Sequence, residues 1–97
     1  MARTDPALGR IRAALKAHFA VVDPLAEIRV EHGYRDNIHI RVVSDHFEPL
    51  TKLQRGDEVW PIVETAAGPE DVLRISLCIA LTPEEYRASY AEPLAAA

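Results

Sequence analysis

The spacing of apolar residues changes along the chain from a helical period to a strand period and back. Between residues 5 and 20, apolar side chains recur every three or four positions in one stripe, which predicts an amphipathic helix. Asp5 is suited to cap this helix and Pro6 to open it, because the first helical position needs no backbone N–H. The Asp-Pro pair at residues 23 and 24 then ends the helix.

After this helix the apolar period becomes two, which predicts two strands joined by a turn at residues 32–36. In the simplest hairpin register Val30 faces Ile38. Ile28 then faces Ile40, so that apolar side chains pair with apolar side chains.

The middle of the chain predicts a pair of short helices. Residues 50–55 are long enough for one or two helical turns, and Gly56 is a natural stop. Asp57 then caps a second helix over residues 58–66, in which Pro61 falls within the first turn and removes no helical hydrogen bond.

The clearest strand is predicted over residues 73–81, where leucine and isoleucine occupy every odd position and are expected to face the core. A capping box at residues 82–85 then starts a last helix that runs to about Ala91. Residues 92–97 are expected to be a tail.

Together these elements predict an α+β fold with the order α-β-β-α-α-β-α. The helix pair makes a crossover, so the second and third strands are expected to be parallel, whereas the hairpin is antiparallel. We therefore expect one domain over residues 1–97, a three-stranded mixed sheet with helices packed on one face. The predicted core is Leu8, Ile11, Leu15, Phe19, Ile28, Val30, Ile38, Ile40, Val42, Val59, Ile62, Val63, Ile75, Leu77 and Ile79.

The opposite face of the sheet is expected to be a mixed, mildly basic surface without a covering helix. Its predicted members are Arg29, His39, Arg41, Val43, Arg74 and Cys78. Such a face can serve as a contact surface, so a homodimer through it is one expected assembly.

Composition narrows the class of protein. The 97 residues are 48% hydrophobic and 27% charged, as in an ordinary globular domain. No apolar run approaches the roughly 18 residues that span a bilayer, and no signal-peptide pattern is present, so a cytoplasmic protein without a membrane partner is expected. The net charge of -4 disfavours nucleic acid as a partner, because most nucleic-acid-binding domains are basic.

Common catalytic motifs are missing from the sequence, which contains no GxSxG, HExxH, GxxxxGK[ST], GxGxxG or CxxC. His32, His39 and His46 are evenly spaced, but they fall on a turn, a strand and a strand exit and are not expected to converge on a metal. The pair of Cys78 and Arg74 has no histidine base nearby in sequence. A non-enzymatic protein is therefore expected.

Two segments resemble the BolA family. Residues 42–60 read VVSDHFEPLTKLQRGDEVW and are similar to the family segment VVS-x-x-F-x-G-x-[ST]-x-x-x-RHR-x-V-[YW]. Residues 73–86 read LRISLCIALTPEEY and are similar to the family ending HALSIKTKTPEEW. The resemblance implies a non-enzymatic domain like the type II KH fold. It also implies a partner, a cytosolic monothiol glutaredoxin, in [2Fe–2S] cluster or stress-response handling, with a role in transcription for some members.

Departures from the family pattern change what is expected of the site. Gly56 and Arg74 stand where the family has histidines, and neither residue ligates iron. His32 is the only remaining candidate ligand, so no iron–sulfur cofactor is expected. Gly56 also leaves a gap beside Trp60, which is expected to hold another ligand or an altered partner contact. The expected partner-binding residues are Arg55, Asp57, Trp60 and Arg74.

Two other functions remain open at this point. A KH-like nucleic-acid-binding or transcription-regulating domain would need a GxxG loop, which the chain lacks, with only Lys52 and Arg55 near the equivalent turn. A small enzyme or ligand carrier would use the open sheet face around His39, Arg41, Arg74 and Cys78.

Overall fold

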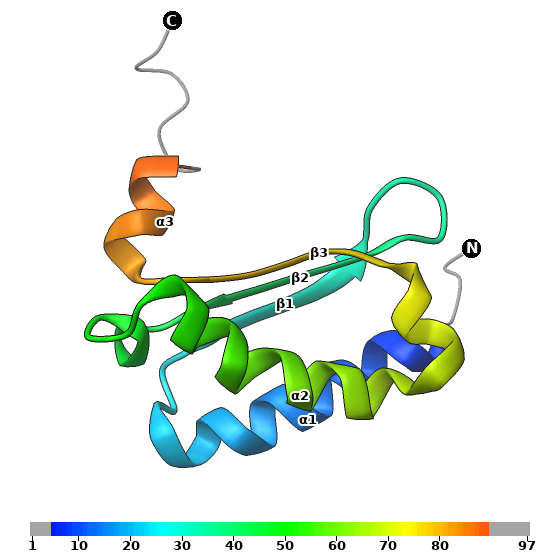
Figure 1. Ribbon diagram of the computed structural model, residues 1–97, viewed down its shortest axis with the longest axis horizontal. Coiled ribbons are helices and arrows are strands. Elements are labelled where there is room, and N and C mark those ends of the chain that lie inside the picture. The colour runs from blue at the N-terminus through cyan, green and yellow to red at the C-terminus, as the bar shows by residue number, and fades with distance from the viewer. Residues whose placement is uncertain (1–4, 90–97) are drawn as a thin grey trace, which may run out of the picture.

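The computed structural model describes residues 5–89, which form a helix layer and a three-stranded sheet (Figure 1). In chain order the elements are α1 (Pro6–Val22), β1 (Glu27–His32), β2 (Ile38–Val43), the short 3-10 helix η1 (Asp45–Phe47), α2 (Lys52–Asp71), the short 3-10 helix η2 (Val72–Arg74), β3 (Ile75–Leu81) and α3 (Pro83–Ser89). The central strand β2 is antiparallel to β1 and parallel to β3. The α+β fold and the mixed sheet are confirmed, whereas the predicted helix end at Ala91 and the tail at residues 92–97 lie outside the described residues.

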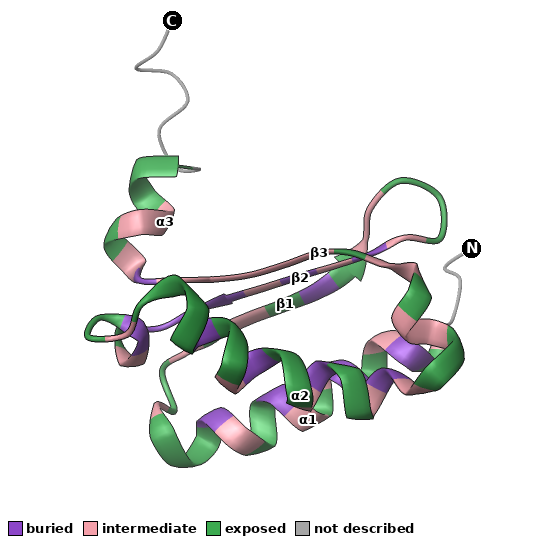
Figure 2. Ribbon diagram, in the orientation of Figure 1, coloured by how far each residue is buried: buried purple, intermediate pink, exposed green. Residues whose placement is uncertain are grey.

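The core lies between the sheet and the two long helices, α1 and α2, which cover one face of the sheet. Figure 2 shows the buried positions on the sides of these helices that face the strands. Phe47 is fully buried although it was not predicted to be a core residue. The Ser44 side chain caps η1, and this single turn brings the Phe47 ring to 5.7 Å from the Phe19 ring.

The hairpin register differs from the prediction by two residues. Val30 pairs with Ile40 rather than with Ile38. The strand β1 ends one residue later than predicted, at His32, and the chain turns after it, at Gly33. A Cβ at Gly33 would lie 2.2 Å from the imidazole of His39, so this close approach requires glycine. Apolar residues still pair with apolar residues, because a shift of two positions keeps each side chain on its face.

The predicted helix boundary at Gly56 is wrong, because α2 runs through it as one helix. Thr51 caps α2 and forms a capping box with Gln54, so the helix begins at Lys52, four residues before Gly56. Packing of the buried side of α2 outweighs the low helix propensity of Gly56 and Pro61. The regular helix is interrupted only at Gly68, whose φ of 85° favours glycine.

The prediction of which β3 side chains point toward the core is also wrong for most of the strand. The pairing of β3 with β2 shifts between Ile38 and His39, so that Ser76 forms a β-bulge. Beyond a bulge the alternation of side chains is reversed relative to the partner strand. Cys78 and Ala80 therefore pack against the core, whereas the predicted core residues Leu77 and Ile79 face the other side.

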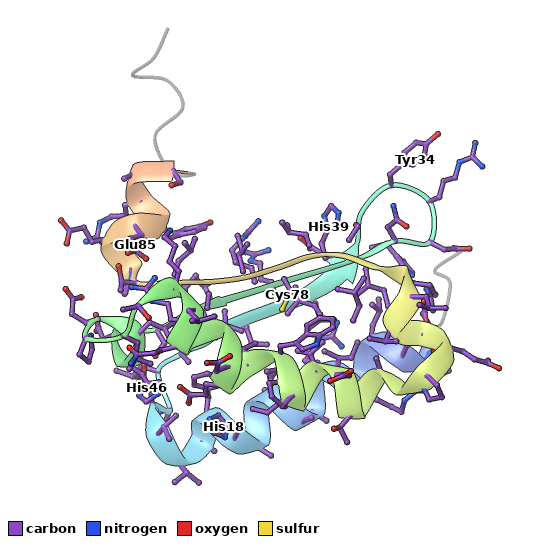
Figure 3. The ribbon with its side chains drawn as sticks, in the orientation of Figure 1. His18, Tyr34, His39, His46, Cys78 and Glu85 are labelled. Atoms are coloured by element: carbon purple, nitrogen blue, oxygen red, sulfur yellow. The ribbon has the colours of Figure 1, made fainter. Side chains whose placement is uncertain are left out.

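The open sheet face accordingly differs from its predicted composition. Figure 3 shows Cys78 on the helix side of the sheet and His39 on the opposite side. Arg74 precedes β3, in η2, and is not part of this face. The expectation of no covering helix is also wrong in part, because Tyr86 of α3 stacks on the Arg41 guanidinium, 5.5 Å from the ring centre.

Truncation of one residue on each face tests the bulge. Ile40→Ala should lower the free energy of unfolding by about 2 to 5 kcal/mol, because this side chain is fully buried against the helices. Leu77→Ala should lower it by only about 1 kcal/mol, because Leu77 is half-buried on the open face. Urea denaturation of both variants measures the difference. Equal losses would place Leu77 in the core and contradict the reversed facing.

Candidate functional site

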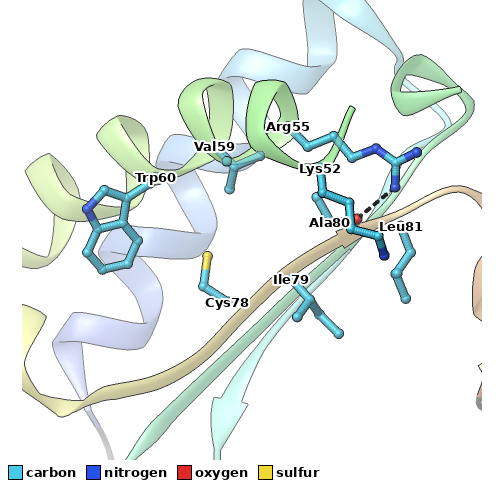
Figure 4. A pocket seen from close by; sticks show the side chains of 9 residues that line it. Lys52, Arg55, Val59, Trp60, Cys78, Ile79, Ala80 and Leu81 are labelled. Atoms are coloured by element: carbon cyan, nitrogen blue, oxygen red, sulfur yellow. Dashed lines mark hydrogen bonds between the residues drawn. The ribbon is translucent and has the colours of Figure 1, made fainter. Parts of the chain in front are cut away.

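A groove lies between α2 and β3 in the described part of the chain. It has a volume of about 280 Å³ (Figure 4). It is lined by Lys52, Arg55, Gly56, Val59, Trp60, Cys78, Ile79, Ala80 and Leu81. Most of these residues are apolar, so the groove suits an apolar group with a polar neighbour at one end.

Small residues keep this groove open. The bulge in β3 places Cys78 and Ala80, rather than leucine and isoleucine, opposite α2. On the helix side Gly56 lines the groove, and a Cβ built there would meet no atom within 4 Å. The groove thus lies at the gap beside Trp60 that was expected from the sequence.

Trp60 and Cys78 form opposite walls of one end of the groove (Figure 4). The Trp60 side chain is still 36% exposed, which is a large apolar surface left in water. Burial raises the pKa of the Cys78 thiol to about 11, so the sulfur stays protonated at neutral pH and is a poor nucleophile. The pairing of Cys78 with Arg74 considered from the sequence does not occur, because Arg74 is bound to other residues.

Arg55 closes the other end of the groove and is buried there. Its guanidinium donates to Glu85 of α3 at 2.6 Å, to the Ala80 carbonyl at 3.3 Å and to the Leu50 carbonyl at 3.1 Å. The Arg55 hydrogen bonds and the Thr82 backbone N–H hold the pKa of Glu85 at about 2. Arg55 therefore joins α2, β3 and α3, and its charge is largely neutralised within the chain.

Arg74 and His32 belong to a second cluster, at the start of α1. Both side chains hydrogen-bond the same Asp5 oxygen, His32 through Nε2 at 2.7 Å. Arg74 also donates to Asp71 at 2.8 Å, and Asp71 accepts a further bond from Arg10. The hydrogen bonds from Arg74 and His32 hold the pKa of Asp5 far below its usual value.

This second cluster does not fit an iron–sulfur cluster. Iron needs thiolate or imidazole donors, and the guanidinium of Arg74 stays protonated at any accessible pH. The Nε2 atom of His32 is already bonded to Asp5. Among the described residues, no group of three or more His, Cys, Asp or Glu side chains is arranged to hold a metal ion.

A third cluster was not predicted. His18 of α1 and His46 of η1 both direct Nε2 at the carboxylate of Glu58 in α2, each at 2.8 Å. Burial raises the pKa of Glu58, the two histidine hydrogen bonds lower it, and the net shift is downward. The cluster links three elements that are distant in sequence and come together only in the folded chain. No local sequence motif predicts it.

The predicted partner-binding residues do not form one surface. Arg55 and Trp60 line the groove, Asp57 is exposed on α2 and does not line it, and Arg74 lies in the cluster at Asp5. The sequence missed the groove residues Val59, Cys78 and Ala80. The Thr51 to Gln54 capping box was the available signal, because a helix starting there places Lys52, Gly56, Val59 and Trp60 on one side.

Comparisons with protein-family models, with curated proteins and with solved structures found no match for this chain. No helix in residues 5–89 is both long and apolar enough to cross a membrane.

The pH dependence of stability tests the Arg55–Glu85 ion pair. Glu85→Gln should lower the free energy of unfolding at pH 7 by about 1 to 2 kcal/mol, because buried Arg55 loses its carboxylate partner while water partly screens Glu85. The pKa of Glu85 falls from 4.5 to about 2 on folding. The pair therefore stabilises fully above pH 4.5 and is lost as the pH falls toward 2. Urea denaturation across this range should show the variant and the wild type converging.

The matched control is Glu84→Gln, one residue away on the exposed side of α3, which should change stability by less than about 0.5 kcal/mol. If Glu85→Gln lowered the free energy of unfolding equally at pH 2 and pH 7, the charge of the carboxylate would contribute nothing to stability.

Proposed function

We propose that this chain is a non-enzymatic, BolA-like protein-binding module that docks a cytoplasmic partner, such as a monothiol glutaredoxin, through the groove between α2 and β3. The proposal includes a role in iron–sulfur or stress-response handling in which the chain contributes no ligand to the cluster. Its main support is the groove itself, an apolar cleft with a half-exposed tryptophan. Tryptophan is enriched among the residues that contribute most to protein interfaces.

The resemblance to the BolA family and the position of the groove point to the same part of the chain. Five groove residues fall in the first resembling segment, namely Lys52, Arg55, Gly56, Val59 and Trp60, and Cys78 to Leu81 fall in the second. The fold has the element order that the resemblance implies. These agreements support a BolA-like module.

The absence of cluster ligation in the proposal rests on residues that are engaged elsewhere. Arg74, at one family histidine position, is committed to Asp5 and Asp71. Gly56, at the other, has no side chain. A glutaredoxin partner would therefore have to retain its cluster with its own ligands.

A KH-like nucleic-acid-binding function is disfavoured by the charges in the groove. Phosphate binding requires several cations, because each neutralised phosphate contributes a separate increment of affinity. Of the two cations that line the groove, Arg55 is paired with Glu85. Lys52 alone then faces a nucleic acid there, on a chain with a net charge of -4.

Binding to a monothiol glutaredoxin tests the proposed function. Isothermal titration with the cluster-loaded partner should show a complex that Trp60→Ala weakens at least about tenfold, because an interface loses its largest apolar anchor. Leu53→Ala is the matched control, since Leu53 is 75% exposed on α2 and does not line the groove. It should leave the affinity unchanged.

The visible circular dichroism of the cluster should be unchanged in the complex. If the wild-type chain changed this spectrum and the His32→Ala variant did not, His32 would be a surviving cluster ligand. That result would contradict the proposal that the chain contributes no ligand. Equal losses of affinity in the Trp60 and Leu53 variants, or the lack of any complex, would overturn the assignment of this partner and groove.

A further inference from the structure

The outer edge of β3 has backbone hydrogen-bonding groups that point away from the sheet. The carbonyl of Leu81 accepts from Ser44, which follows β2, so it faces the sheet, whereas the carbonyl of Ala80 accepts from Arg55 on the outer side. Backbone groups alternate in direction along a strand. The N–H and C=O of Cys78 and the N–H of Ala80 therefore point outward, and no strand in residues 5–89 pairs with them.

The two edges of the sheet are protected differently. In β1, residues Glu27, Arg29 and Glu31 supply charged side chains, and Arg12 donates to the Val30 carbonyl at 2.7 Å. Charged residues are a common means of preventing a strand from pairing with another chain. The seven residues of β3, ISLCIAL, include no charge and no proline. This edge is thus suited to accept another strand.

The groove lies directly beside this open edge. Its volume of about 280 Å³ is below the roughly 300 to 1,000 Å³ of most small-molecule pockets, and it suits a single apolar side chain better than a cofactor. In a paired strand, the residue opposite Cys78 directs its side chain to the same face as Cys78. That side chain would enter the space between Cys78 and Trp60.

The other end of the groove is positive. Lys52 is exposed and lies near Ala80 and Leu81, whereas Trp60 lies near Cys78 (Figure 4). Because Glu85 neutralises Arg55, Lys52 supplies a net positive charge at this end. Residues that are two apart in a strand lie on the same face, about 6.6 Å apart. An acidic residue two positions from the apolar one would reach Lys52.

We propose that the groove binds an extended peptide segment of a partner protein, which adds to β3 as a fourth strand. The peptide inserts one apolar side chain between Trp60 and Cys78 and places an acidic residue, two positions away, beside Lys52. This inference rests on the proposed protein-binding function and specifies its ligand. Main-chain bonds to Cys78 and Ala80 supply affinity, and the two side chains supply specificity.

The charges favour a foreign peptide over a second copy of the chain. A second β3 paired edge to edge would bring the sequence ISLCIAL, which has no acidic residue for Lys52. The sugar-phosphate backbone of a single-stranded nucleic acid has no N–H groups with which to bond an edge strand. Both occupants are therefore less suitable, and both are measured below.

Selection from a phage-displayed library of random ten-residue peptides tests the proposal on the full chain. The selected peptides should share an acidic and an apolar residue two positions apart. Synthetic copies should bind by fluorescence anisotropy, whereas a twelve-residue oligothymidylate should not. N-methylation at a single peptide residue that bonds β3 should weaken binding at least about tenfold, and methylation at the next residue should not, because only alternate amides face the partner strand.

Two variants of the protein locate the site. Gly56→Leu should weaken binding at least about tenfold by filling the groove, and it should fold, because there is free space around the Gly56 Cβ position and leucine is the better helix former. Gly9→Leu is the matched control, since Gly9 lies in α1 with equally free space and should bind as the wild type does. Lys52→Glu should lower the affinity for peptides that carry the acidic residue. It should leave unchanged the affinity for peptides in which that residue is replaced by Gln. Thermal denaturation confirms that each variant folds.

The outcomes separate this inference from the proposed function. Failure to select peptides, selection of peptides without the paired residues, or equal tolerance of N-methylation at adjacent positions would overturn strand addition. If Gly56→Leu still blocked the glutaredoxin in that case, the protein-binding function of the groove would stand. Binding of the oligothymidylate, or sedimentation as a dimer that Gly56→Leu dissociates, would assign the groove to a nucleic acid or to a second copy and overturn the inference.

Discussion

The β-bulge at Ser76 determines which residues of β3 face the helices. Without it, the unbroken alternation of the strand would direct Leu77 and Ile79 under α2, and their bulk would fill the space beside the helix. With it, the smaller Cys78 and Ala80 take those places, and a groove remains between α2 and the sheet edge. Bulges are common at sheet edges and beside functional sites, where they redirect side chains. The groove and the choice of Cys78 and Ala80 as the residues whose amides point outward both follow from this one irregularity.

Ion pairs hold the helices to the two ends of β3. Arg55 ties the start of α2 to the end of β3 and to α3, and Arg74 ties η2 to the start of α1 through Asp5. Arg55 is buried, whereas the other three side chains of these two pairs are partly exposed, so breaking either pair has a moderate cost. Two arginines that were expected to bind a partner thus have internal structural roles. The apolar groove that Arg55 closes at one end remains open to a partner, which is why we propose binding at Trp60 and the edge of β3.

The features that were predicted correctly from the sequence depend on residues that are close together in the chain. The helical stripe, the Asp5 cap and the Thr82 to Glu85 capping box each depend on neighbours within a few residues, and each element formed as expected. The bulge depends on how β3 fits β2 and α2, so alternation alone predicted the wrong face. Gly56 was a misleading stop signal in a helix that tertiary packing carries past it. Arg55 and Arg74 find carboxylates 30 and 69 positions away, and nothing local to either arginine points to these partners.

Backbone amide hydrogen exchange, followed by NMR, tests the open edge of β3 most directly. In the free protein, the amides of Leu77 and Ile79 should exchange slowly because they bond β2, and those of Cys78 and Ala80 should exchange at least about tenfold faster because they point outward. A peptide bound in the groove should slow the exchange of Cys78 and Ala80 alone among these four. Slow exchange of Cys78 and Ala80 in the free protein, or rates that a bound peptide leaves unchanged, would contradict the account.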